Sequence, residues 1–227
     1  MKEALKTIPE LFYDLLANLI PGFVTLEFVA ISPIVQQNFA DWDISSLPVV
    51  DRTLFSILGG YLIGQFLTTV SDIFVRRPVW LVFGETSINL LGDGTALIKP
   101  LPKPLDPDLA SALKLEIERA LSIEFTNLKA HSLLDMCEQY VKKYDYEAGM
   151  LCQKRHALVV LSRNMIIGLL ILLPCYWSIG LKAHLLILFA ALVFFVRWNY
   201  LRIRRAEFLY HCFHNTYLAT QKLQARN

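Results

Sequence analysis

The sequence lacks the short motifs that mark many enzyme active sites. It has no Gly-rich phosphate loop, no HExxH and no GxSxG. It also lacks a CxxC pair, so its four cysteines predict neither a zinc site nor a disulfide framework. Charge is scarce as well, and a net charge of +2 is too small to indicate nucleic-acid binding. These absences favour a protein that is not an enzyme and that uses no metal and no cofactor.

Apolar residues, by contrast, are abundant. The chain is 55% hydrophobic with a mean hydropathy of +0.43, which is typical of membrane proteins. Two apolar segments, 164–181 and 184–198, follow each other with only Lys182 and Ala183 between them. Each approaches the roughly 20 residues that cross a bilayer core. A helix that is apolar on all sides has no place on a soluble surface, so the pattern predicts a transmembrane hairpin.

Two earlier segments are further candidates for membrane spans. The first, 15–35, contains Pro21-Gly22, which we expect to break or kink the helix. Its N-terminal flank has no clean basic region and no small-residue cleavage site, so we expect this segment to stay as an anchor. The second, 53–75, contains Gly60-x-x-x-Gly64, a pattern that lets helices approach closely. We expect it to stop at Arg76-Arg77.

Arginines set the expected orientation. They flank the same ends of the second, third and fourth spans, whereas the opposite loops carry a single lysine, or three aspartates and one arginine. The positive-inside rule then places both termini and the middle segment in the cytoplasm of a cell whose inner membrane the chain crosses several times. The arginines concerned are Arg76, Arg77, Arg155, Arg163, Arg197, Arg202, Arg204 and Arg205.

The middle segment, 78–157, reads as a small cytoplasmic domain. Residues 87–99 favour two short strands around Gly92-Asp93-Gly94. A Pro-rich connector follows, and Asp106 with Pro107 predicts the start of a helix. A second helix is expected near Ser132, with Asp135 as its capping-box partner. Without a clear break before 160, it is expected to form a stalk over 133–160 that continues into the third span.

Together these patterns predict an all-α membrane protein with four transmembrane helices and a small, mostly helical cytoplasmic domain. Its expected parts are an N-terminal hairpin over 1–77, the cytoplasmic segment 78–157, a second hairpin over 158–201 and a cytoplasmic C-terminal helix over 202–227.

Polar residues within the predicted spans are the first candidates for function, because such groups usually face the bundle interior or a water-filled path. These pore candidates are Glu27, Gln65, Asp72 and Arg163. A structural alternative pairs Asp72 with Arg76 one turn away and lets Arg163 reach the interface. Gly60 and Gly64 are expected to pack a neighbouring span or a second copy of the chain.

The basic end of the fourth span offers a second candidate site. Arg197, Arg202, Arg204 and Arg205 would suit an anionic lipid or a phosphorylated ligand, and the alternative is a plain stop signal. Nearby, His211 and His214 are too few to fill a metal shell. The spacing of Arg205 and His211 resembles the Arg-x4–6-His pattern of HEPN ribonucleases, which implies a histidine for acid–base work and an arginine on phosphate.

The segment 146–217 has the order helix, two close spans, helix. Lys154-Arg155 and Arg163-Asn164 mark its entry, 178–184 its short loop and 202–217 its exit helix. In this order it resembles the SLATT-type two-span effector modules of bacterial defence systems. The resemblance implies an effector that assembles in the inner membrane and permeabilises it when a cytoplasmic signal arrives.

The leading hypothesis is therefore a homo-oligomeric inner-membrane effector or channel, gated through its cytoplasmic helices, with a role in prokaryotic antiviral defence. Its partners would be the lipid bilayer, further copies of itself and a cytoplasmic protein or nucleotide signal. One alternative is a non-conducting anchor or sensor that recruits a soluble partner. A third is a membrane-tethered HEPN-like ribonuclease.

Overall fold

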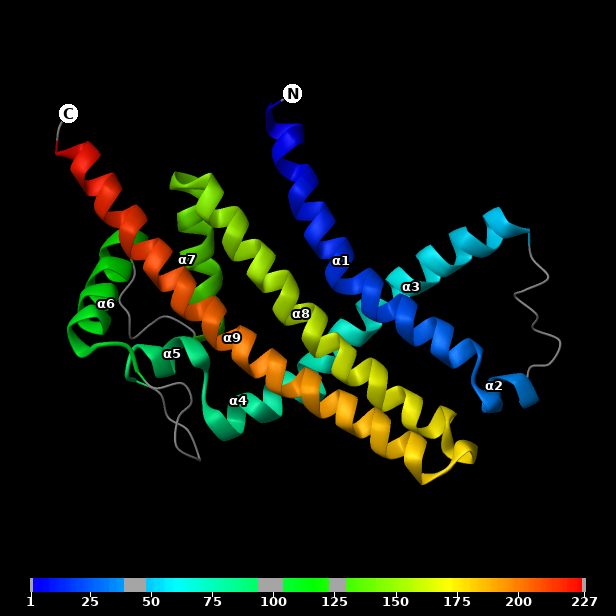
Figure 1. Cartoon of the computed structure of the whole chain (residues 1–227). Coiled ribbons are helices and arrows are strands. Elements are labelled where there is room, and N and C mark those ends of the chain that lie inside the picture. The colour runs from blue at the N-terminus through cyan, green and yellow to red at the C-terminus, as the bar shows by residue number, and fades with distance from the viewer. Residues whose placement is uncertain (1, 39–47, 94–103, 123–129, 226–227) are drawn as a thin grey trace. The chain divides into compact units, whose positions relative to one another are not determined.

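A computed structural model describes residues 2–38, 48–93, 104–122 and 130–225, and these residues are all-helical, without a strand (Figure 1). Four helices are long and apolar enough to cross a membrane. The chain forms two compact units. We call Met1–Val75 with Ala157–Asn199 the span unit, and Arg76–His156 with Tyr200–Asn227 the polar unit. We take the parts of the four helices that lie in the span unit as the candidate spans.

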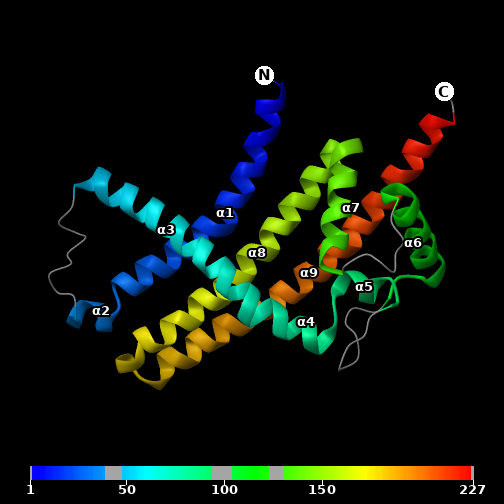
Figure 2. The ribbon, with the colours of Figure 1, turned by 180° about the vertical axis from the view of Figure 1, so that it is seen from behind.

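In the span unit, α1 (Lys2–Ala30) crosses α3 (Val49–Ser71), as Figures 1 and 2 both show. Of the break or kink expected at Pro21-Gly22, the break is wrong, because α1 is an unbroken helix. The chain breaks instead after Ala30, where the Ser32 hydroxyl accepts a hydrogen bond from Val35 N at 3.4 Å. This cap, with Pro33 at the first position, starts α2 (Pro33–Asn38).

We expected the second span to stop at Arg76-Arg77, and the helix itself continues past these two residues. After α3 the backbone widens into a π-helical turn, η2 (Asp72–Arg76), and continues as α4 (Arg77–Phe83). Because Pro78 lies at the start of α4, its missing N–H removes no bond that the helix needs. Gly84 ends the helix at a positive φ of 74°, a conformation that glycine adopts without strain.

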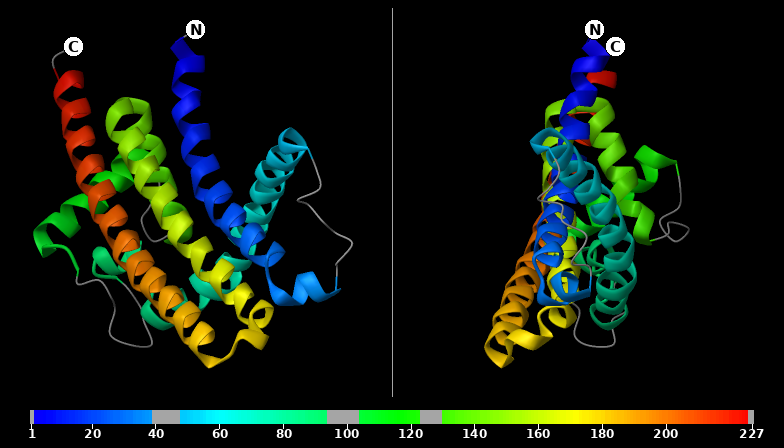
Figure 3. Two further views of the ribbon diagram at one scale, coloured as in Figure 1. Left: turned by 45° about the vertical axis from the view of Figure 1, so that its right-hand side comes forward. Right: turned by 90° about the vertical axis from the view of Figure 1, so that its right-hand side faces the viewer.

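The last two candidate spans form a hairpin. Helix α8 (Tyr146–Cys175) leads through the short 3-10 turn η4 (Trp177–Ile179) into α9 (Leu181–Gln224), and Figure 3 shows the two helices side by side. Gly180, at φ 101°, makes the turn. The fourth span and the C-terminal helix were expected as two segments but are one continuous helix of 44 residues. In the span unit α9 exposes a broad apolar face that includes Leu185, Leu186, Phe189, Leu192 and Val196.

The polar unit packs α5 (Thr86–Leu90), α6 (Pro107–Leu121) and α7 (Ala130–Tyr144) against the first turns of α8 and the end of α9. The expected start of α6 is confirmed, because the Asp106 carboxylate accepts a hydrogen bond from Asp108 N at 3.0 Å. The core is apolar and fully buried, and it includes Leu90, Leu113, Ile117, Leu133, Cys137, Val141, Leu209 and Phe213.

The expected strand before Gly92 is wrong, because residues 86–90 form the short helix α5. A short apolar run does not by itself distinguish a strand from a buried helix turn. Here the Asn89 amide donates to Phe83 O at 2.6 Å and ties α5 to the end of α4. Gly92 supplies the turn at φ 84°, and the second expected strand lies outside the described residues.

The expected stalk over 133–160 is also wrong, because the helix is interrupted at Asp145. Helix α7 ends at Tyr144, and the Asp145 carboxylate caps α8 by accepting from Ala148 N at 3.1 Å. The reversal is tight, since a Cβ at Gly149 would lie 2.7 Å from the Lys142 backbone. Helix α7 begins at Ala130, so Ser132 lies inside the helix and is not its N-cap.

Replacing Asp145 with alanine should therefore cost about 0.5–2 kcal/mol of stability in the polar unit, because the first turn of α8 loses its cap. Hydrogen exchange of the amides of residues 146–149 should become faster. Asp145→Ser retains a side-chain acceptor and should restore most of the protection. Equal protection in wild type and Asp145→Ala would show that the cap contributes nothing.

Candidate functional site

Four polar side chains meet inside the span unit, one from α1, two from α3 and one from α8. They are Asn18, Thr68, Ser71 and Asn164. The Asn164 amide, fully buried, donates to the Thr68 hydroxyl at 2.7 Å, and the Ser71 hydroxyl donates to Asn164 Oδ1 at 2.9 Å. Thr68 in turn donates to Asn18 Oδ1 at 2.6 Å. Three helices are thus joined by hydrogen bonds between buried or half-buried polar side chains.

Pro21 leaves a backbone carbonyl of α1 available to Asn164. Proline has no N–H, so the carbonyl of Ala17, four residues earlier, has no helical donor. The Asn164 amide donates to that carbonyl at 3.4 Å and so replaces the missing bond. The proline that was expected to break or kink α1 therefore leaves a free acceptor that a neighbouring helix uses.

Glycines let the backbones of α1 and α3 touch next to the polar cluster. A Cβ at Gly22 would lie 1.8 Å from the carbonyl oxygen of Gly60, and one at Gly64 would lie 2.0 Å from that of Asn18. Both distances are far below van der Waals contact, so neither position accommodates a side chain. Gly60 and Gly64 thus pack a neighbouring span of the same chain, and that face is not available to a second copy.

Of the four predicted pore candidates, the structure brings two together. The Arg163 guanidinium donates to the Asp72 carboxylate, which lies at the first residue of the π-helical turn. The Arg163 side chain is only 7% exposed, whereas that of Asp72 is 41% exposed. A buried cation is thus held by an acid at the edge of the span unit.

The other two candidates lie apart from this pair and from each other. Glu27, near the end of α1, is half-buried and accepts a hydrogen bond from the Ser56 hydroxyl at 3.1 Å. Gln65 lies on the opposite face of α3 from the glycines and is exposed. The four residues therefore do not line one polar path within the described part of a single chain.

In the polar unit, the three arginines of the proposed basic site have separate surroundings. The Arg205 guanidinium lies 2.6 Å from the Glu138 carboxylate, and Arg204 forms an ion pair with Glu207 at 3.0 Å. Arg202 lies close to Glu85, and burial raises the pKa of that carboxyl to about 7. Arg204 and Arg205 thus each pair with a carboxylate of the same chain. Arg197, in the span unit, is exposed.

The two histidines near these arginines have different surroundings. Arg205 is held by Glu138, while His211 is exposed and lies almost two helical turns further along α9. His214 instead contacts the Glu116 carboxylate on α6, with Nδ1 at 2.9 Å. Within the described residues no three His, Cys, Asp or Glu side chains gather as metal ligands. Burial raises the pKa of Cys137 to about 12, so this core thiol stays protonated.

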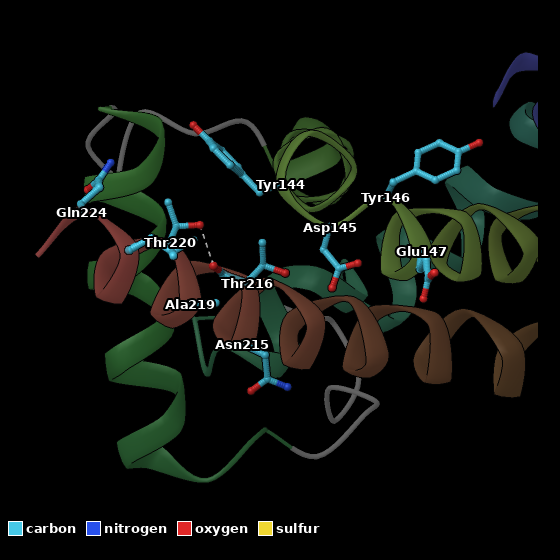
Figure 4. Close-up of a pocket in the computed structure, with 10 residues that line it drawn as sticks. Tyr144, Asp145, Tyr146, Glu147, Asn215, Thr216, Ala219, Thr220 and Gln224 are labelled. Carbon is cyan, nitrogen blue, oxygen red and sulfur yellow. Dashed lines mark hydrogen bonds between the residues drawn. The ribbon is translucent and has the colours of Figure 1, made fainter. Parts of the chain in front are cut away.

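The polar unit also has a surface pocket of about 550 Å³ where α7 meets α8 beside the end of α9 (Figure 4). Asp145 points toward α9, and the rings of Tyr144 and Tyr146 lie on either side of it. From α9 the pocket is lined by Asn215, Thr216, Ala219, Thr220, Leu223 and Gln224.

No family model, curated protein or solved structure matches the chain. The polar cluster is therefore defined by its own geometry. Sequence reasoning missed Asn18 and Asn164, although each is an amide within an apolar helix. The other sequence feature that could have indicated the cluster is the pair Thr68 and Ser71, which lie one turn apart on the glycine face of α3.

Proposed function

We propose that the chain is a homo-oligomeric inner-membrane effector, channel-like in action, whose state is set by its polar unit. The observation that carries the proposal is the continuity of α8 and α9. Each helix contributes residues to the polar unit and to the span unit without a break. A change in how these helices pair in the polar unit would therefore reach the candidate spans through stiff helices.

Gating of this kind requires two packings of the polar unit that differ in their affinity for a signal. The resemblance to SLATT-type modules supports a cytoplasmic protein or nucleotide as that signal, and antiviral defence as the setting. Both termini and the polar unit would then lie in the cytoplasm.

Glu27 is the residue that we propose to influence ion passage. Its carboxylate accepts from a neutral hydroxyl, and no ion pair joins it to a cation in the described part of the chain. Such an acid retains its capacity to attract a cation. Four spans are too few to enclose a wide pore, so conduction would require several copies.

The test measures mass and ion flux on one sample of the full chain. The protein is sized in nanodiscs and then assayed for K⁺ flux in liposomes. We expect a defined oligomer that conducts, with Glu27→Gln lowering the flux several-fold at unchanged mass. Asp108→Asn, which neutralises an exposed acid in the first turn of α6, is the matched control and should conduct like wild type. A monomer that passes no ions would refute the proposal.

A specific observation favours a second candidate, a non-conducting anchor or sensor that recruits a soluble partner. The polar cluster pairs its groups within the chain, as expected for a stable anchor, and the pocket beside Asp145 offers a surface for a partner. An oligomer that passes no ions would support this candidate. Binding of a cytosolic protein by the full chain, lost in Thr220→Arg within the pocket, would then establish it.

A further inference from the structure

A stripe of exposed residues runs along the outer face of α3. The buried face of this helix carries Ser56, Gly60, Gly64, Leu67 and Ser71. On the opposite side, exposed residues recur in steps of three and four, which is the spacing of a seam between two packed helices. We call this stripe the α3 seam, and its members are Phe55, Leu58, Leu62, Gln65 and Thr69.

Gln65 is the unusual member of the seam. It lies at the middle of the candidate span 53–75, where lipid tails offer no hydrogen bonds. The residue is exposed, and its side-chain amide makes no hydrogen bond within the described part of the chain. The neighbouring Thr69 hydroxyl is bonded to the backbone of its own helix, to Gln65 O at 3.3 Å.

We propose that a second copy of the chain packs its α3 against the α3 seam, with Gln65 hydrogen-bonded to Gln65. A side-chain amide is both donor and acceptor, so two copies related by a twofold axis satisfy each other. The flanking leucines, 63% exposed at Leu58 and 69% at Leu62, supply the apolar layers around the amides. This inference rests on the homo-oligomer of the proposed function and names its contact surface.

The structure favours a second copy over the two other occupants of this face. Lipid would cover the leucines but would leave both groups of the amide without a partner. A different protein would need a matching polar group at the same depth, whereas a second copy carries one by symmetry. The glycine face, the usual site of such contacts, is already occupied by α1.

Site-directed cross-linking of the full chain in nanodiscs tests the contact. Leu58→Cys places a thiol on the seam. Ile57→Cys places one on the preceding residue, which points about 100° away around the helix. Under copper-phenanthroline oxidation, we expect a cross-linked dimer from Leu58→Cys and only the wild-type background from Ile57→Cys. Adding Gln65→Leu to Leu58→Cys should weaken dimer formation about three- to thirtyfold. Gln65→Asn, which keeps an amide, should retain part of it.

The outcomes separate this inference from the proposed function. Cross-linking at Leu58 without ion flux would keep the contact and refute the channel. Flux and an oligomeric mass without cross-linking at Leu58 would keep the channel and overturn the contact. Equal cross-linking at Leu58 and Ile57, or none at either, would also overturn it.

Discussion

Gly64→Ala is expected to destabilise the span unit by about 3 kcal/mol or more, at the upper end of what overpacking costs. The added methyl group would lie 2.0 Å from the carbonyl oxygen of Asn18. Backbone atoms have no other rotamer, so α1 and α3 would have to separate. Their separation would also lengthen the hydrogen bond from Thr68 to Asn18, which now measures 2.6 Å.

Gly59→Ala is the matched control on the same helix. A methyl group there would meet only the end of the Leu26 side chain, at 3.2 Å, and that side chain can rotate. We expect a change within about 0.5 kcal/mol. Unfolding in mixed micelles, followed by circular dichroism, measures both variants. If Gly64→Ala were as stable as Gly59→Ala, the close crossing of α1 and α3 would be wrong.

The sequence predicted those features that a single helix determines. Four long apolar helices follow from composition and length, and the start of α6 follows from Asp106, Pro107 and Asp108. Local signals of this kind act within a few residues of each other. The break at Asp145 was missed because an aspartate fits equally well on the surface of a helix and at its cap.

Features that depend on two helices were not predictable in the same way. Pro21-Gly22 was expected to break or kink α1. The helix is unbroken, the proline frees a carbonyl for Asn164, and the glycine contacts Gly60. Both effects depend on residues far along the chain. Of the candidate site, the sequence indicated Arg163 and Asp72 as polar groups in spans. It left Asp72 either among the pore candidates or paired with Arg76, and the structure shows a contact between Asp72 and Arg163.

The contact between Asp72 and Arg163 leads to an asymmetric prediction. Asp72→Asn should destabilise the span unit by about 2–4 kcal/mol, because the guanidinium, 7% exposed, loses its carboxylate. Arg163→Gln should cost less, about 1–2 kcal/mol, because the Asp72 side chain is 41% exposed and can be solvated. The double variant should cost less than the sum of the two, since it leaves no charge behind.

The same unfolding measurement in mixed micelles completes this double-mutant cycle. Asp51→Asn, an exposed acid in the first turn of α3, is the control and should shift stability by less than about 0.5 kcal/mol. A smaller loss for Asp72→Asn than for Arg163→Gln would contradict the burial that the structure assigns to the pair. Strictly additive losses would show that the two charges do not interact. A coupling of about 1 kcal/mol or more would identify the pair as a determinant of how α8 docks on α3.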